Sequence, residues 1–466
     1  MNPILLQQRR SFLAQSCRGI GGVALASLFN KANAAGTTGI VAKPHLPPKI
    51  KRVIFLVMAG GPSHLETFDN KPVLAKHNGQ PMPESFTKGQ PIAQLQGAKL
   101  NCLGPQWGFK KHGQSGLEMN ELFTHLPNVA DDLCVIRSMK TEAINHDPAH
   151  TFMNTGSSVS GRPSMGSWVT YGLGSETEDL PGFVVLTSAR GGQMQPIASR
   201  QWSAGFLPGK YQGVHLRGQG DPVLYLTNPP GVDRNKQRDV IDAVSQLNQL
   251  QNSVVDDPEI ATRISQYELA FKMQASVPAL MELKQEPKAV LESYGITGAD
   301  GSFAANCLLA RRLAQKGVRF IQLYNRDWDH HGGVKDGIKQ KIEEIDRPCA
   351  ALIKDLKRLG MFDDTLIVCT GEFGRTPMSQ GGSGRDHHMK GFSLWLAGGG
   401  IKGGTTHGAT DDFGYHAAEN VVEVFDLHAT MLHLLGVDHE RLTFRFQGRD
   451  YRLTDVHGKI VKEILS

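Results

Sequence analysis

The sequence predicts an α/β protein, a three-layer α/β/α sandwich around a mostly parallel central sheet. Two observations lead to this fold class: continuous apolar runs of strand length recur along the chain, and amphipathic helical patterns lie between several of them. Strands that are apolar throughout are typical of sheets covered on both faces, and strand, helix and strand in alternation favour parallel pairing. The 466 residues, 40% hydrophobic and 20% charged, argue against a disordered, fibrous or multi-span membrane protein.

Six apolar runs are the candidate strands. The first ends in a Gly-Gly-Pro-Ser turn, from Gly60 to Ser63. Short apolar runs that end in turn-forming residues favour buried strands over helices. The six runs are residues 52–58, 133–136, 183–186, 318–324, 365–370 and 392–397.

Helical patterns fill much of the chain between these runs. One helix is predicted from Ser302 to Gly317, with a capping serine at its start and a glycine at its end. Another has apolar residues every three or four positions from 338 to 349, and a last one extends over 426–435. Residues 233–291 contain helix signals and no strand run, so we expect a helical insertion there.

The first 34 residues have the order of an export signal: a basic segment, a short apolar segment and a small-residue cleavage site at Ala34. Arg9-Arg10, followed by Ser-Phe-Leu, resembles a twin-arginine signal. This implies the twin-arginine translocase as a partner and a periplasmic or extracellular location. The alternative is an amphipathic N-terminal helix, and the apolar segment is too short for a stable membrane span.

We therefore divide the chain into a signal, residues 1–34, a linker, residues 35–50, and one domain, residues 51–466. The formal net charge of the whole sequence is +5. The signal holds four basic residues and no acid, so the rest of the chain carries only +1. That charge predicts no nucleic-acid partner.

A dense group of potential metal ligands follows the predicted strand 318–324. Asp327, Asp329, His330 and His331 lie within five residues of one another. They stand at the edge of the sheet where α/β proteins place their ligands. Carboxylate oxygen and neutral imidazole nitrogen together suit zinc, manganese or iron. A solvated turn is the alternative, but the density and the position of these side chains favour a metal site.

A second polar group surrounds the predicted strand pair 365–370 and 392–397. Glu372 and Arg375 follow the first of these strands, and Asp386 and His387 precede the second. Loops at neighbouring strand ends can converge on one ion or on a pair of ions. The guanidinium of Arg375 matches the geometry of a tetrahedral oxyanion, although an ordinary ion pair with Glu372 or Asp386 is the alternative.

A third group, His146 and His150, stands where a helix begins, shortly before Thr155-Gly156. The N-terminus of a helix offers backbone N–H groups and the positive end of its dipole to an anion. These histidines are therefore candidates for binding or catalysis. A capped helix start with surface histidines is the alternative. The turn from Gly60 to Ser63 is a weaker candidate for an oxyanion site.

The order of these motifs resembles the alkaline phosphatase and sulfatase superfamily and, within it, the family called domain of unknown function 1501. The resemblance covers most of the chain after the signal. It implies an alkaline phosphatase-like fold and a divalent metal ion: zinc, manganese or calcium. The motifs that carry it are Gly60-Gly61-Pro62-Ser63, Phe68-Asp69, Asn145-His146, Thr155-Gly156, Trp328-Asp329-His330-His331-Gly332, Gly371-Glu372-Phe373-Gly374-Arg375-Thr376-Pro377, Arg385-Asp386-His387 and Asp426-Leu427-His428-Ala429-Thr430.

The resemblance assigns metal ligands residue by residue. Asp327 with His331 is similar to the superfamily's Asp-x-x-x-His metal pair, and Asp329 offers a shorter Asp-x-His alternative. His387 is similar to the histidine that precedes the next strand in such enzymes, which would complete one metal site. The residues that would hold or approach a second ion are Glu372, Asp386 and His146.

Three departures from the superfamily pattern leave the chemistry open. Glu372-Phe373 stands in place of Asp-His, and Ala59-Gly60 replaces the Asp expected after the first strand. His146 occupies the place where sulfatases carry their nucleophile. It could be a nucleophile, a replacement ligand or a general acid. Alternatively, Ser63, Ser157 or a metal-bound water could attack.

The sequence thus predicts an exported, metal-dependent hydrolase of sulfate or phosphate esters, with a small-molecule or polysaccharide ester as substrate. The alternative is a catalytically degraded, non-enzymatic protein that binds a metal or a glycan on the same fold. The candidate catalytic residues are His146, His150 and Arg375. The candidate metal ligands are Asp327, Asp329, His331, Glu372, Asp386 and His387.

Overall fold

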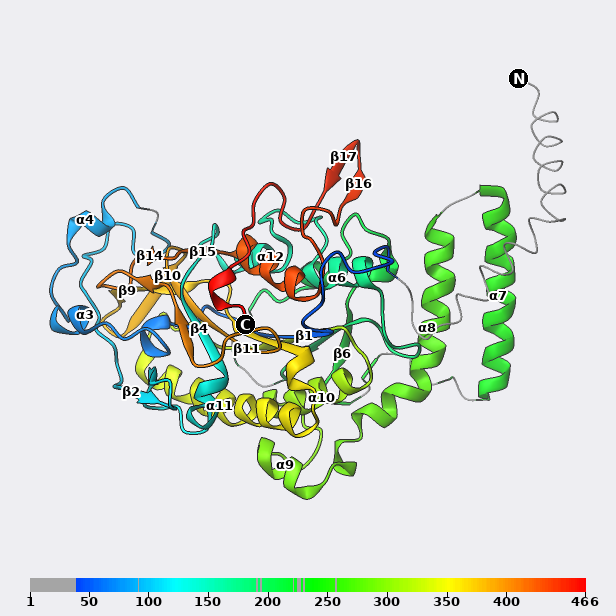
Figure 1. Ribbon diagram of the computed structural model, residues 1–466, viewed down its shortest axis with the longest axis horizontal. Coiled ribbons are helices and arrows are strands. Elements are labelled where there is room, and N and C mark those ends of the chain that lie inside the picture. The colour runs from blue at the N-terminus through cyan, green and yellow to red at the C-terminus, as the bar shows by residue number, and fades with distance from the viewer. Residues whose placement is uncertain are drawn as a thin grey trace.

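The computed structural model (Figure 1) describes residues 39–466, except residues 91, 190, 191, 193, 194, 221, 224–227, 229, 230, 256 and 257. The predicted twin-arginine signal, residues 1–34, and the first part of the linker lie outside the described residues. Within the described part, no helix combines the length and the apolar character that a membrane span needs.

A nine-stranded sheet forms the centre of the fold. The apolar runs predicted as strands all belong to it, because a continuous apolar strand can be buried on both faces. Along the sheet the strands are β12 (Thr405–His407), β4 (Leu133–Lys140), β11 (Phe392–Gly398), β8 (Thr365–Thr370), β1 (Arg52–Met58), β7 (Phe320–Asn325), β5 (Phe183–Thr187) and β6 (Val214–Arg217), with β15 (Val422–Glu423) also paired to β4.

Helices cover both faces of this sheet (Figure 1). On one face, Ile54 and Leu56 of β1 belong to a core shared with α10 (Phe303–Gln315) and α11 (Val334–Arg358). On the other, Val53 and Phe55 pack with α5 (His146–Thr155), α6 (Met165–Leu173) and α12 (Val424–Leu434). Successive strand residues point to opposite faces, so one strand feeds both cores. The three-layer α/β/α prediction is confirmed.

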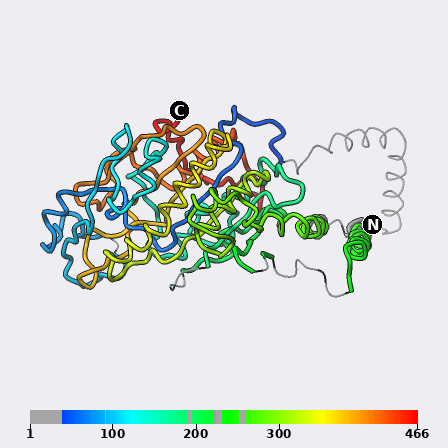
Figure 2. The backbone as a smooth tube through the Cα atoms, turned by 90° about the horizontal axis from the view of Figure 1, so that it is seen from below, coloured from blue at the N-terminus to red at the C-terminus, as the bar shows by residue number. Residues whose placement is uncertain are grey.

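The stretch predicted as a helical insertion, residues 233–291, contains α7 (Arg234–Val255) and α8 (Pro258–Met281), and α9 (Lys288–Tyr294) continues three residues beyond its predicted end. Figures 1 and 2 show α7 as the outer helix, on the far side of α8 from the sheet. Arg238 of α7 bonds to Glu268 of α8, which joins the two helices. The status of this stretch as an insertion stays a prediction.

Several short elements lie outside the central sheet. The hairpin of β9 (Gly374–Gln380) and β10 (Gly384–His388) directly precedes β11 and matters most for the site. The others are α3 (Pro72–Lys76), α4 (Glu84–Thr87), the pair β2 (Phe109–His112) and β3 (Leu117–Asn120), the pair β13 (Ala409–Thr410) and β14 (Ala417–Glu419), and the pair β16 (Phe444–Phe446) and β17 (Arg449–Tyr451).

Strand direction decides which loops meet. β1 pairs in parallel with both β7 and β8, whereas β11 is antiparallel to both β8 and β4. β4 therefore runs in the same direction as β8. The chain segments that follow β1, β4, β7 and β8 all emerge at one edge of the sheet, and the segment that precedes β11 stands at that same edge.

Candidate metal centre

Two groups of potential ligands meet at this edge. Asp329, His331, His387 and His146 form the first group, and His146, His150 and Glu372 form the second. Within each group the ligand atoms all lie within 4.8 Å of one another, and His146 belongs to both groups. We call them the Asp329 cluster and the Glu372 cluster. They bring together residues that follow β4, β7 and β8 with the last residues before β11.

Asp329 is the centre of the first cluster. Its Oδ1 lies 2.9 Å from His331 Nε2 and 3.3 Å from His387 Nε2, and its Oδ2 lies 3.2 Å from His146 Nε2. Arg375 also donates a hydrogen bond to Oδ1. One carboxylate therefore faces three imidazoles and one guanidinium.

The ring orientations of His331 and His387 leave their Nε2 atoms facing each other. His387 Nδ1 donates to the carbonyl oxygen of Ile144 at 3.0 Å, and His331 Nδ1 donates to Gln380 Oε1. With the proton of each neutral ring on Nδ1, both Nε2 atoms carry a lone pair, yet they lie only 3.0 Å apart. Two lone pairs at this separation need a positive charge near them, either a shared proton or a metal ion. Outer partners on Nδ1 are also typical of metal-binding histidines.

The Glu372 cluster is more deeply buried. The side chains of Glu372 and His150 have no exposed surface. The Gly60 amide donates to both carboxylate oxygens of Glu372, at 3.0 and 3.2 Å, and His146 Nδ1 lies 2.6 Å from Glu372 Oε1. Neither ring nitrogen of His150 makes a hydrogen bond among the described residues, and its Nε2 lies 3.4 Å from Glu372 Oε1. Buried polar atoms are nearly always bonded, so this ring is suited to an additional ligand.

Electrostatics keep both carboxylates ionised. Burial alone would raise the pKa of Asp329, but its contacts with His146, His331 and His387 and the charge of Arg375 hold it well below its usual range. Burial would likewise raise the pKa of Glu372, and His150 and His146 lower it to about 2. Both groups therefore carry a negative charge at neutral pH, which attracts a cation.

The histidines divide into two kinds. Burial lowers the pKa of His150 and His387, so their rings are neutral and can ligate a metal. Burial also acts to lower the pKa of His146, but its bonds to Asp329 and Glu372 raise it to about 9. Without a metal, His146 is therefore a cation between two carboxylates, and it must lose a proton before it can ligate.

Arg375 and Arg385 are both buried and bound to protein groups. Arg375, 1% exposed, donates to the carbonyl oxygens of Gly60, Gly61 and Arg385 as well as to Asp329. Arg385 pairs with Glu66 and also donates to backbone carbonyls. Arg375 thus ties the turn after β1 to Asp329, and its predicted role in binding an ester oxyanion stays a prediction.

Asp327 and Asp386 lie outside both clusters. Asp327 has a left-handed backbone (φ 68°), and its Oδ2 accepts a hydrogen bond from the Gly192 amide. It lines a separate cavity of about 670 Å³ beside α10 and α11. Asp386 Oδ2 accepts from the amides of Gln94 and Leu95, at 2.6 and 2.9 Å. It holds the segment around residue 94 beside the site.

Of the two serines considered as nucleophiles, Ser63 is buried and Ser157 lies far from His146. Ser63 is 1% exposed, and its Oγ has no hydrogen-bond partner among the described residues. Ser157 follows the C-terminal end of α5, whereas His146 is at its first turn. A ten-residue helix is roughly 15 Å long, so Ser157 lies far from His146.

Several supporting residues were not predicted. Gln380 and the Ile144 carbonyl orient the two histidine rings, and Phe373 packs against His146 and His387 with ring centroids 4.9 and 4.8 Å apart. Gly60 belongs to the turn that was a weaker candidate for an oxyanion site, and the bond of its amide to Glu372 was not predicted. Its φ is 121°, and a Cβ there would lie 2.6 Å from the Asp329 amide nitrogen. Only glycine allows this close approach of the turn to the site.

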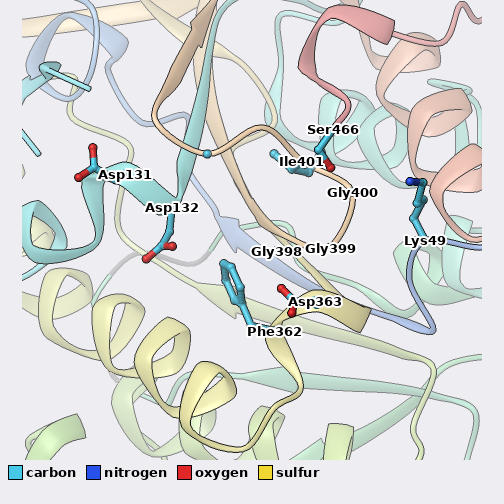
Figure 3. Close-up of a pocket in the computed structure, with 11 residues that line it drawn as sticks. Lys49, Asp131, Asp132, Phe362, Asp363, Gly398, Gly399, Gly400, Ile401 and Ser466 are labelled. Atoms are coloured by element: carbon cyan, nitrogen blue, oxygen red, sulfur yellow. The ribbon is translucent and has the colours of Figure 1, made fainter. Parts of the chain in front are cut away.

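A further cavity, of about 410 Å³, lies away from the metal ligands (Figure 3). It is lined by the glycine-rich segment that begins at Gly398, together with Lys49, Asp132 and Asp363. Gly398 ends β11, whereas His387 precedes the start of that strand. The cavity is therefore at the opposite edge of the sheet and is no part of the metal centre.

The chain resembles known proteins at two levels: a distant likeness to solved structures and a match to a family model. A phosphonate monoester hydrolase from Silicibacter pomeroyi aligns with a TM-score of 0.34 at 13% identity, over 83% of this chain and 73% of its own. A sulfatase from Pseudoalteromonas sp. aligns with a TM-score of 0.34 at 12% identity, over 90% of this chain and 72% of its own. Likenesses this distant do not indicate an activity. No curated protein matches the chain. A family model described as protein of unknown function (DUF1501) matches residues 50–465, and the chain belongs to that family.

Proposed function

We propose that this protein is an exported, metal-dependent hydrolase of sulfate or phosphate esters. The observation that carries the proposal is the sharing of His146 by two ligand clusters at the carboxyl edge of the sheet. Adjacent ligand groups of this kind suit a pair of ions that act on one ester. The edge itself is where α/β folds bind their ligands.

The donor set supports zinc or manganese over calcium. Calcium takes only oxygen ligands, whereas the two clusters together offer four imidazoles and two carboxylates. When bound, a divalent ion supplies Lewis-acid activation of an ester oxygen and lowers the pKa of a coordinated water. Two features fit such an ion. The ring of His150 makes no hydrogen bond among the described residues, and the lone pairs of His331 and His387 face each other.

Each residue of the two clusters would have a role in holding the ions. Asp329, His331 and His387 would hold one ion, and Glu372 with His150 would hold a second. Arg375 and the Gly60 amide would keep the two carboxylates in place. His146 would lose its proton and ligate between the two sites. We favour this ligand role over a nucleophilic one because His146 already lies within 3.2 Å of oxygens from both carboxylates.

Metal analysis combined with a substrate screen tests the function. The mature protein, loaded with zinc or manganese, should bind two equivalents tightly and should hydrolyse an aryl phosphate, an aryl sulfate or a sulfated polysaccharide. Removal of the metal by a chelator should abolish turnover, and its return should restore it. A protein that binds no metal would refute the proposal.

One observation favours the alternative, a non-enzymatic metal- or glycan-binding protein. Of the two serines considered as nucleophiles, Ser63 is 1% exposed, and Ser157 lies beyond the far end of α5 from His146. Tight binding of two ions without turnover of any ester in the screen would support this alternative.

Export is tested separately through the arginine pair. Replacement of Arg9 and Arg10 by lysine should leave unprocessed precursor in the cytoplasm if the twin-arginine pathway carries the protein. Normal processing and export of that variant would refute the assignment.

A further inference from the structure

We propose that Arg200, Arg217 and Arg326 form a second anion-binding subsite beside the metal centre, which holds another oxyanion group of a substrate that carries several. The inference rests on the proposed function for the identity of the reacting ester. It names the substrate class more narrowly: a polyanionic ester, such as an oligosaccharide with more than one sulfate or phosphate group.

The register of the sheet places two of these arginines at the same edge as the metal ligands. In β5, Thr187 pairs with Tyr324 of β7 on one side and with Arg217 of β6 on the other. The strands are parallel, so Arg217 stands level with the end of β7. Arg326 follows that end directly and precedes Asp329 by three residues.

Ring contacts join this region to the Glu372 cluster. The ring of His150 lies 6.4 Å from that of Tyr324, Tyr324 lies 6.1 Å from Trp202, and Trp202 lies 5.7 Å from His215. His215 Nε2 is 3.0 Å from the hydroxyl of Thr187. Successive ring contacts thus extend from the metal ligands along the ends of β7, β5 and β6.

The three arginines belong to the segments that carry these rings: Arg200 to that of Trp202, Arg217 to that of His215, and Arg326 to the end of the strand of Tyr324. The register puts Arg217 and the residue before Arg326 at the ends of their strands, and in agreement with this the pKa of His215 is lowered by partial burial and further by the positive charges of both arginines. Arg200, two residues before Trp202, donates to Asp147 in the first turn of α5. Its side chain is 32% exposed.

Arg217 and Arg326 differ from Arg200, which makes an ion pair with Asp147. Within the described part of the chain, neither Arg217 nor Arg326 makes an ion pair, and the buried Nε of Arg326 has no hydrogen-bond partner. The adjacent acid, Asp327, accepts a bond from the Gly192 amide instead. A guanidinium group without a carboxylate partner is suited to an added oxyanion, which it can bind with two parallel hydrogen bonds.

Binding of oligosaccharides, which needs no turnover, tests the subsite. The metal-loaded protein is titrated with a sulfated hexasaccharide, with the same hexasaccharide after desulfation, and with inorganic sulfate. The test variant carries Arg217→Gln and Arg326→Gln. The matched control carries Arg263→Gln, an exposed arginine of α8. Metal content and hydrolysis of a singly charged aryl ester are measured for each variant.

The wild-type protein should bind the sulfated hexasaccharide more tightly than the desulfated one, and added salt should weaken this preference. The double variant should lose about tenfold or more of the affinity for the sulfated form. Its metal content and its rate on the aryl ester should match those of the wild type and of Arg263→Gln.

Three results would overturn the subsite: equal binding of the two hexasaccharides, an equal loss in the control variant, or binding of inorganic sulfate as tight as that of the hexasaccharide. The last result would mean a site for free anions. If the preference for the sulfated form depends on the two arginines but no ester is hydrolysed, the proposed function fails and the subsite stands.

Discussion

Replacement of Gly60 by alanine tests whether the turn after β1 supports the metal centre. At Gly60 the φ angle is 121°, and a Cβ would lie 2.6 Å from the amide nitrogen of Asp329 and 2.8 Å from backbone atoms of Trp328. Backbone atoms cannot give way as a flexible side chain can. The turn must therefore move, and with it the Gly60 amide that donates to Glu372.

Gly161→Ala is a matched control. Its φ is 111°, close to that of Gly60, but no atom lies within 4 Å of the added Cβ. In both variants, alanine at a positive φ destabilises the folded protein by about 1–3 kcal/mol. Only Gly60→Ala also loses a hydrogen bond to a charged carboxylate, a contribution of about 1.5–3 kcal/mol. That difference corresponds to roughly a 10- to 150-fold change in an equilibrium constant.

The expected result is a loss of zinc affinity of roughly tenfold or more in Gly60→Ala, with the affinity of Gly161→Ala unchanged. Competition with a chromogenic chelator measures the affinity, and circular dichroism at the same temperature shows that each variant is folded. Wild-type affinity in a folded Gly60→Ala protein would refute the argument, because the amide would then contribute nothing to the position of Glu372. An equal loss in both variants would assign the effect to general strain.

The remaining predictions concern single histidines. His331→Ala and His387→Ala should each lose about one equivalent of metal, while the exposed control His125→Ala keeps both; unchanged metal content in the two ligand variants would refute the Asp329 cluster. His146→Ala should lose metal and activity together if His146 is a ligand, whereas loss of activity with full metal, and a trapped phospho- or sulfo-histidine, would establish a nucleophile. Burial lowers the pKa of His64 from 6.5 to about 3, so unfolding takes up a proton in between, and the free energy of unfolding falls as the pH falls. Between pH 7 and 5 this group should contribute a loss of about 2 kcal/mol, and urea unfolding of metal-free His64→Asn should show a correspondingly smaller loss.

Much of the sheet follows from the sequence, because its central strands are apolar throughout. The predicted bounds of β1 and β8 agree with the structure, and β7 begins two residues later than predicted. The hairpin of β9 and β10 was missed because Gly374–Gln380 includes Pro377 and has no apolar alternation. The antiparallel direction of β11 could not be predicted, since direction depends on contacts between strands and not on local pattern.

The sequence predicted that histidines and carboxylates would be the ligands, but not which of these residues would come together. The resemblance matched Asp327 to the metal pair and left Asp329 as the alternative. The left-handed backbone at Asp327 directs its side chain to the Gly192 amide, whereas Asp329 lies among the histidines. The missing imidazole at Phe373 suggested an incomplete second site. The structure brings His150 to that site from α5, a placement that depends on packing between distant segments.

The reversed strand β11 also bears on how the molecule reaches its native state. The ligands that meet at one edge come from segments as far apart as His146 and His387, and the last of them is positioned by a strand that completes the pairing between β4 and β8. Contacts between such distant segments form late and slowly in folding. An ion that binds only the completed set stabilises the native state by mass action. Metal retention should therefore report on the folding of the whole domain, and a nascent chain released before β11 should hold no ion at this edge.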